Sequence, residues 1–153
     1  MKKILSKSVL QTEKIANSLA KSLKGNEIIS LYGDLGAGKT SFTKGLSKAL
    51  NVNPDEVHSP TFTLLNEYNG KYKRYHFDMY KINSFEELYS IGFFDFIENG
   101  IIITEWSENI DKFLPESAIK IHIEYGQNEN ERILKFENCE VDFNENISCK
   151  CRF

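Results

Sequence analysis

The sequence has 153 residues, of which 41% are hydrophobic and 27% are charged. This length is typical of one domain, and it allows a sizeable core without a disulfide or a metal to hold it together. The formal net charge of −3 excludes a strongly basic nucleic-acid-binding protein, because phosphate binding requires an excess of Lys and Arg. Only three of the 19 basic residues are arginines, so bidentate phosphate clamps are few.

Targeting signals and a disulfide framework are both missing from the sequence. The N-terminal lysines precede no apolar core of the kind a signal peptide has, and no apolar run approaches the ~18 residues of a membrane span. The three cysteines, Cys139, Cys149 and Cys151, are odd in number and clustered late in the chain. We therefore expect reduced thiols in a cytoplasmic protein that does not contact a membrane.

The first third of the chain alternates between helical and strand patterns. Apolar residues recur at helical spacing over 9–23, and a short apolar run over 28–32 ends at a glycine, as a buried strand does. Residues 39–50 carry a second apolar helical stripe.

Strand patterns follow over 62–68 and 71–80, on either side of Asn69-Gly70. An Asn-Gly pair in this place predicts a hairpin with a type I′ turn, in which both central residues have positive φ. On the second strand Tyr75, Phe77 and Met79 share one face. The opposite, polar face is made of Arg74, His76 and Asp78.

The second half begins with a helix and ends in strands. Ser84 and Glu87 form a capping box that predicts a helix broken at Gly92, with a second piece over 93–98. The β-branched run 101–104 is typical of a strand buried on both faces. Two further strands are predicted, over 119–125 and 132–137.

Residues Gly33 to Thr40 match the pattern G-x-x-x-x-G-K-[ST] at every fixed position. Glycines let backbone N–H groups curl around phosphates, and the following helix N-terminus favours anions. Lys39 is then expected to reach the β- and γ-phosphates, and the Thr40 hydroxyl to bind Mg²⁺. The alternative is a plain glycine-rich turn between a strand and a helix.

The motif and its strand-helix context together predict the fold. We expect an α/β, three-layer P-loop NTPase-like domain with a mixed, largely parallel central sheet and an antiparallel hairpin. The two late strands extend this sheet, and residues 1–153 form a single domain.

Three further residues are candidates for the reaction. Thr61, in Ser59-Pro60-Thr61-Phe62, is placed to approach the metal or the γ-phosphate, or else belongs to a proline turn. Asp78 is placed to orient water or support the metal, or else is an exposed strand residue. Glu105 follows a buried strand, where a carboxylate suits Mg²⁺, or else caps the strand end.

Other P-loop classes fit poorly. The Asn-Lys-x-Asp and Asp-x-x-Gly strings of GTPases do not occur. Because no arginine lies between Arg74 and Arg132, a kinase lid is disfavoured, and an AAA-type ATPase needs a longer chain and an arginine finger.

Taken together in this order and spacing, four segments resemble the TsaE family, which consists of small bacterial ATPases of the tRNA threonylcarbamoyladenosine pathway. The segments are Gly33 to Thr40, Ser59 to Phe62, His76 to Tyr80 and Glu105-Trp106. The resemblance covers about residues 8–137 and leaves 138–153 as a divergent tail. It implies ATP, ADP and Mg²⁺ as ligands and a weak, partner-dependent ATPase. The partner is a TsaB–TsaD-like complex that modifies adenosine 37, and tRNA is contacted only through it.

The resemblance also implies roles for individual residues. The phosphates are bound by Gly36, Ala37, Gly38, Lys39, Thr40 and Ser41, and Mg²⁺ by Thr40 and Glu105. Lys39, Thr61, Asp78 and Glu105 are the catalytic set. Thr12, Trp106 and Arg132 are expected near the nucleotide, with His76 as a structural hydrogen-bonding residue. Two alternatives stay open: a nucleotide-dependent docking module with little hydrolysis, and a small-molecule phosphotransferase.

Overall fold

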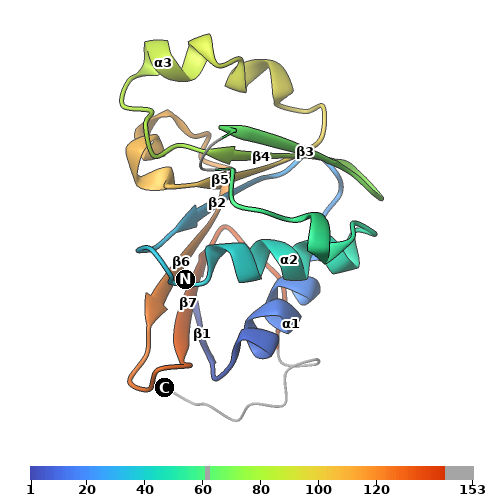
Figure 1. The fold of residues 1–153 in the computed structure, drawn as a ribbon, viewed down its shortest axis with the longest axis vertical. Coiled ribbons are helices and arrows are strands. Elements are labelled where there is room, and N and C mark those ends of the chain that lie inside the picture. The colour runs from blue at the N-terminus through green and yellow to red at the C-terminus, as the bar shows by residue number, and fades with distance from the viewer. Residues whose placement is uncertain (61–62, 144–153) are drawn as a thin grey trace.

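The computed structural model describes residues 1–60 and 63–143, in which helices cover both faces of a seven-stranded sheet (Figure 1). The strands are β1 (Lys2–Ser6), β2 (Ile28–Tyr32), β3 (Leu65–Asn69), β4 (Lys73–Asp78), β5 (Ile101–Glu105), β6 (Ile119–Tyr125) and β7 (Arg132–Glu137). The α-helices are α1 (Val9–Ala20), α2 (Lys39–Ala49) and α3 (Phe85–Ser90). Short 3-10 helices are η1 (Pro54–Glu56), η2 (Phe93–Phe96), η3 (Ser107–Asn109) and η4 (Asp111–Phe113).

The strands run in the order β1-β7-β6-β2-β5-β4-β3. The four central strands, from β6 to β4, are parallel, whereas β3 at one margin and β7 and β1 at the other pair antiparallel. This confirms the mixed sheet, the antiparallel hairpin and the extension by the two late strands. Since β2, β5 and β4 are parallel, their carboxyl ends meet at one edge, where open α/β sheets bind ligands.

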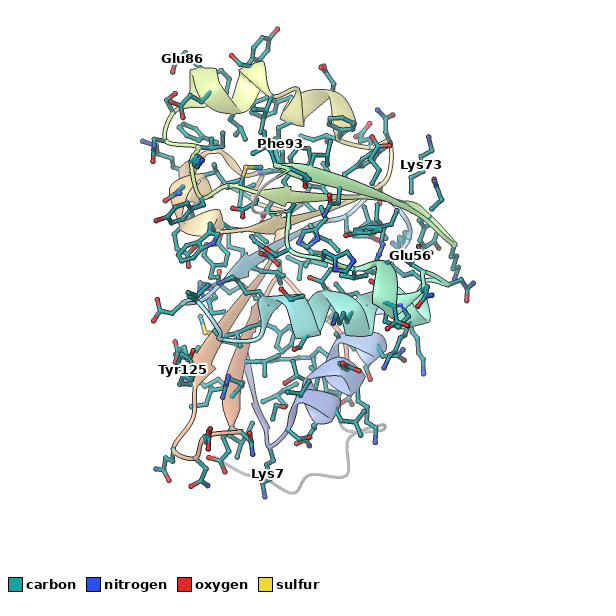
Figure 2. The ribbon with its side chains drawn as sticks, viewed as in Figure 1. Lys7, Glu56, Lys73, Glu86, Phe93 and Tyr125 are labelled. Atoms are coloured by element: carbon teal, nitrogen blue, oxygen red, sulfur yellow. The ribbon has the colours of Figure 1, made fainter. Side chains whose placement is uncertain are left out.

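Alternate side chains of the central strands pack into two separate cores, which makes the fold three-layered. Ile29 and Leu31 of β2 face the core that also contains the apolar stripes of α1 and α2. Ile28 and Ile102 face the opposite core, beneath α3 and η2. Phe93 of η2 lies between that outer layer and the sheet (Figure 2). Both faces of β2 and β5 are buried, as their apolar runs predict.

The elements before residue 50 are where the periodicity predicts them, with one helix end displaced. The buried strand is Ile28–Tyr32, and α2 covers all but the last residue of the predicted helix. However, α1 ends at Ala20, three residues before the predicted end. Leu23 still packs into the core, so an apolar residue beyond the last helical turn extended the pattern without extending the helix.

The predicted two-residue hairpin turn is wrong. Asn69 pairs with Lys73, so three residues connect β3 to β4, and neither Asn69 nor Gly70 has positive φ. A Cβ on Gly70 would lie 2.2 Å from the carbonyl oxygen of Leu50. The glycine is therefore required for close approach to the end of α2, and the adjacent Lys71 N–H donates to that same oxygen (2.8 Å).

The two faces of β4 are assigned correctly, but the polar face is not exposed. Arg74, His76 and Asp78 are all buried, with at most 4% of their surface exposed. The exposed-strand alternative for Asp78 is therefore wrong. Burial lowers the pKa of Arg74 to about 10, and its guanidinium lies 5.2 Å from the centre of the Tyr68 ring.

The chain ends contain the parts that the pattern did not predict. β1 is an edge strand whose half-exposed residues carry little apolar periodicity, and it forms only by pairing with β7. Past β7, the Phe143 ring packs at an angle of 36° to the Phe136 ring, with ring centres 4.7 Å apart. Burial raises the pKa of the free Cys139 thiol, whereas Cys149 and Cys151 lie outside the described residues. Within residues 1–60 and 63–143, no helix has the length and apolar character needed to cross a membrane.

Candidate functional site

The glycine-rich loop, residues 33–40, connects the carboxyl end of β2 to the first turn of α2. Gly36 and Gly38 adopt left-handed conformations, with φ of 78° and 114°. A Cβ on Gly33 would lie 2.6 Å from the carbonyl oxygen of Ile123 on β6. All three glycines of the motif therefore have positive φ, and Gly33 also allows close packing against the sheet.

Lys39 is buried at the start of α2 and folds back over the loop. Its Nζ donates to the carbonyl oxygens of Gly33 (2.5 Å) and Asp34 (3.1 Å). The ammonium also lies 4.5 Å from the centre of the Trp106 ring. These contacts place a cation inside the concave side of the loop, where phosphate oxygens would meet it.

A cavity of about 370 Å³ opens between the loop, the end of β5 and the segment after η1. Its lining residues are Leu35, Gly36, Gly38, Lys39, Thr40, Ser41, Ser59, Glu105 and Trp106. Seven of these were predicted as nucleotide or metal site residues, so the fold brings most of the predicted set to one place.

Glu105 is the last residue of β5, one residue later than the predicted strand end, and only 3% of its surface is exposed. A hydrogen bond of 3.1 Å joins Nε2 of His76 to its Oε1. The Ser59 hydroxyl donates to its Oε2 (3.4 Å). The carboxylate is thus held from two sides at the rim of the cavity.

Asp78 ends β4 and pairs in register with Glu105, so two buried carboxylates lie side by side at the ligand edge of the sheet. Its Oδ1 accepts the N–H of Tyr80 (2.8 Å). Its Oδ2 is buried and has no hydrogen-bond partner within residues 1–60 and 63–143. A buried carboxylate oxygen without a hydrogen-bond partner is able to accept a hydrogen bond from a water molecule or to bind a cation.

Trp106 directly follows β5 in a left-handed conformation with φ of 55°, which is unfavourable for a side chain of this size. Its half-buried ring lies between the Lys39 ammonium and the Tyr80 ring, whose centre is 5.1 Å away. The ring therefore lines the cavity and also borders the outer core.

The back of the loop rests on a second set of polar contacts. Oε1 of Glu108 accepts the Gly33 N–H (3.0 Å), and the Tyr32 hydroxyl donates to Asp111. Lys120 also donates to Asp111 (2.7 Å), and these two hydrogen bonds, that of Lys120 first, lower the pKa of its carboxyl. Burial, followed by the bond to Asp111, raises the pKa of Tyr32.

Arg132 contacts the loop and Thr12 lies in the first turn of α1, and neither residue is in the lining of the cavity. Nε of Arg132 donates to the carbonyl oxygen of Ala37 (2.9 Å), whose side chain is buried. The Thr12 hydroxyl is buried and shares a hydrogen bond with Ser6 (2.7 Å). Thr61 lies outside the described residues, so its predicted role has no structural counterpart here.

Two neighbours of the loop were missed by sequence reasoning. Ser59 lies in a segment that the sequence singled out for Thr61, two residues later, and only its hydrogen bond to Glu105 distinguishes it. Tyr125 ends β6, and its hydroxyl donates to the carbonyl oxygen of Leu35 (2.8 Å). No local pattern marks either residue, because both act on groups distant in the sequence.

Comparison with known proteins identifies the family. The family model described as "Threonylcarbamoyl adenosine biosynthesis protein TsaE" matches residues 6–134, against the expected 8–137. The chain is 40% identical over 124 residues to the tRNA threonylcarbamoyladenosine biosynthesis protein TsaE of Rickettsia felis, which covers 80% of this chain and 72% of that protein. It is 48% identical over 110 residues to the protein of the same name from Aquifex aeolicus, covering 71% and 78%.

A solved structure agrees with the sequence relatives. The crystal structure of Bacillus subtilis YdiB matches with a TM-score of 0.67 and 31% identity, covering 88% of this chain and 83% of that one. The family match, residues 6–134, spans the glycine-rich loop and the strands from β2 to β6. The chain belongs to the TsaE family.

Proposed function

We propose that this protein is a Mg²⁺-dependent ATPase that supports the formation of N6-threonylcarbamoyladenosine at position 37 of tRNA. One observation carries the proposal: Lys39, Thr40 and Glu105 line a single cavity at the carboxyl edge of the parallel strands. The names of the curated relatives supply the pathway, since they are tRNA threonylcarbamoyladenosine biosynthesis proteins.

The loop and the start of α2 are the phosphate-binding part of this proposal. The first turn of α2 leaves backbone N–H groups unpaired, since the first helical bond runs from Phe42 to the Gly38 carbonyl. Lys39 exchanges its bonds to loop carbonyls for bonds to phosphate oxygens, which as charge-assisted pairs are stronger. The remaining predicted contacts, from Gly36, Ala37, Gly38 and Ser41, belong to the same cradle.

The residues present also fit Mg²⁺. A hydroxyl (Thr40) and a carboxylate (Glu105) line the cavity, and the unpaired Oδ2 of Asp78 is on the neighbouring strand. Hard oxygen donors of this kind, few in number and supplemented by water and phosphate, are what Mg²⁺ takes. When bound, Mg²⁺ neutralises charge on the β- and γ-phosphate oxygens. Among the described residues no group of three or more His, Cys, Asp or Glu could hold a metal ion, so in this proposal phosphate and water would complete the ligands of Mg²⁺.

The carboxylates are the groups that this chain offers for hydrolysis. In hydrolysis, a water oxygen bonds to the γ-phosphorus, the bond to the bridging oxygen of ADP breaks, and the proton of the water passes to a phosphate oxygen or to solvent. Glu105 is held by His76 and Ser59 at the cavity rim, and Asp78 is paired with it in register on the neighbouring strand. This arrangement supports a role for one of the two carboxylates in orienting the water. Thr61 is proposed on the γ-phosphate side from the family pattern alone.

The proposed partner is a TsaB–TsaD-like complex, as the family resemblance implies, in the cytoplasm. In this arrangement ATP hydrolysis supports repeated turnover of the complex, and the modification chemistry takes place on the partner. A net charge of −3 is consistent with a protein that contacts tRNA through its partner.

The test is phosphate release from ATP by the chain with the partner complex present, with and without EDTA. Hydrolysis should require Mg²⁺ and should fall at least about a hundredfold in Lys39→Ala and Glu105→Ala. Unchanged turnover in both variants contradicts an ATPase. Multi-turnover tRNA modification with a non-hydrolysable ATP analogue favours the docking module, and phosphate found on a metabolite favours a phosphotransferase.

A further inference from the structure

The outer side of the glycine-rich loop is bound by the hairpin of β6 and β7. Tyr125 ends β6 and Arg132 begins β7, and the two residues are paired across the antiparallel ladder. The guanidinium of Arg132 lies 4.5 Å from the centre of the Tyr125 ring. Figure 2 labels Tyr125 on this arm of the sheet, which lies apart from α3 and the outer core.

The two side chains bind three consecutive carbonyl groups of the loop. The Tyr125 hydroxyl donates to Leu35 (2.8 Å), and Arg132 donates from Nε to Ala37 (2.9 Å) and from Nη2 to Gly36 (3.4 Å). The other guanidinium nitrogen, Nη1, donates to the carbonyls of Glu129 and Glu131, both at 2.8 Å, within the hairpin turn. Four of the five guanidinium N–H groups are therefore used on backbone oxygens, and they connect the loop to the hairpin.

Peptide geometry turns this anchoring into an effect on the opposite face of the loop. In a planar trans peptide the C=O and the following N–H point in opposite directions. Holding the Leu35 and Ala37 carbonyls toward the hairpin therefore turns the N–H groups of Gly36 and Gly38 away from it. Both glycines line the cavity, and neither N–H has an acceptor among residues 1–60 and 63–143. The N–H between them, of Ala37, is used within the loop, on the Asp34 carbonyl (3.0 Å).

We propose that Tyr125 and Arg132 are positioning residues that preorganise the loop, so that the Gly36 and Gly38 N–H groups face the phosphates of the nucleotide. This inference rests on the proposed function. It gives Arg132 a role on the loop itself, in addition to its expected place near the nucleotide. Because a preorganised loop favours the ground state and the transition state alike, its loss should raise KM while kcat stays within about twofold.

The test uses Tyr125→Phe, Arg132→Gln and Arg132→Lys, with Lys135→Gln as the matched control. Tyr125→Phe keeps the ring and removes only the hydroxyl that holds Leu35. Lys135 is a second β7 cation, bound to Glu124 (2.7 Å) away from the loop, so its loss should leave nucleotide affinity unchanged. Affinity for ATP and ADP is read from the fluorescence of Trp106, and loop order in the nucleotide-free chain from NMR relaxation of residues 35–38.

We expect ATP affinity to fall about threefold to tenfold in Tyr125→Phe and about tenfold to a hundredfold in Arg132→Gln. Arg132→Lys should resemble Arg132→Gln, since a lysine lacks the fork that reaches several carbonyls. Loop order should fall in all three variants before nucleotide is added.

Two results would overturn the inference. One is wild-type loop order in the nucleotide-free variants. The other is wild-type affinity in Tyr125→Phe and Arg132→Lys alongside weak binding in Arg132→Gln, which indicates direct charge contact with phosphate. A wild-type chain that does not bind ATP contradicts the proposed function instead, and the relaxation measurement still decides whether the hairpin orders the loop.

Discussion

Nε2 of His76 lies 3.1 Å from Oε1 of Glu105, and the two side chains are buried on the neighbouring strands β4 and β5. This hydrogen bond joins two adjacent strands at the edge of the sheet where the glycine-rich loop begins. The other carboxylate oxygen of Glu105, Oε2, accepts the hydrogen bond from Ser59, and both residues line the cavity. His76 therefore sets the orientation of the carboxylate on which the proposed chemistry depends.

The first prediction concerns the strength of this pair. Replacing His76 by leucine removes the donor and leaves a buried carboxylate short of a partner, so the free energy of unfolding should fall by about 1–3 kcal/mol. In a Glu105→Gln background the same replacement should cost less, because no buried charge is left unpaired. Urea unfolding of the wild type, the two single variants and the double variant measures the cost of His76→Leu in each background. Equal costs in the two backgrounds would show that the two residues are not coupled.

The second prediction concerns Lys39. Removing its ammonium in Lys39→Ala should weaken ATP binding by about tenfold to a hundredfold, since charge-assisted bonds to phosphate are lost. The emission of Trp106, the single tryptophan, should also change without nucleotide, because a cation 4.5 Å from its ring is gone. Lys48→Ala, later on the same helix and paired with Glu13, is the control and should bind ATP normally. Unaltered emission in Lys39→Ala would contradict the cation-ring contact.

The third prediction concerns the crossing of α1 and α2. A Cβ on Gly45 would lie 2.3 Å from the carbonyl oxygen of Glu13, so Gly45→Ala forces the two helices apart. Although alanine favours a helix by up to about 1 kcal/mol over glycine, we expect a net loss of about 1–3 kcal/mol in stability. Thermal unfolding measures it against Lys44→Ala on the same helix, which should change the melting temperature little. A stabilised Gly45→Ala would show that the helices do not cross this closely.

The fourth prediction concerns pH. Lys120 and Tyr32 hold the pKa of Asp111 below its ordinary value of 3.8. Acidification therefore protonates this carboxyl in the unfolded chain first, so its stabilising contribution is complete above about pH 4 and is lost as the pH falls through the lowered pKa. Asp111 is half exposed, so solvent screening keeps the effect below about 1 kcal/mol. As the pH is lowered from 6 to 3, the midpoint of urea unfolding should fall less in Asp111→Asn than in wild type. Parallel plots of midpoint against pH for the two proteins would show that Asp111 does not contribute to the pH dependence.

Elements with a strong local pattern could be predicted from the sequence. The run 28–32 is a buried strand because it is continuously apolar, and 39–50 is a helix because its apolar residues recur at helical spacing. β1 could not be predicted, since its stability comes from hydrogen bonds to β7 more than 120 residues later. The prediction of a two-residue turn at Asn69-Gly70 was wrong for a similar reason. The glycine is required by its close contact with Leu50 and not by the conformation of the turn.

For the candidate site, the chemical groups could be predicted from local patterns: a glycine-rich loop before a helix, a lysine, a threonine hydroxyl and acidic residues that follow strands. How these groups are held depends on contacts between distant parts of the chain. The hydrogen bond of His76 to Glu105, the burial of Asp78 and the binding of the loop by Tyr125 and Arg132 all join residues distant in the chain. Local patterns depend on which backbone conformations are favourable for neighbouring residues. Contacts between distant residues depend instead on the order and register of the strands, which no local pattern contains.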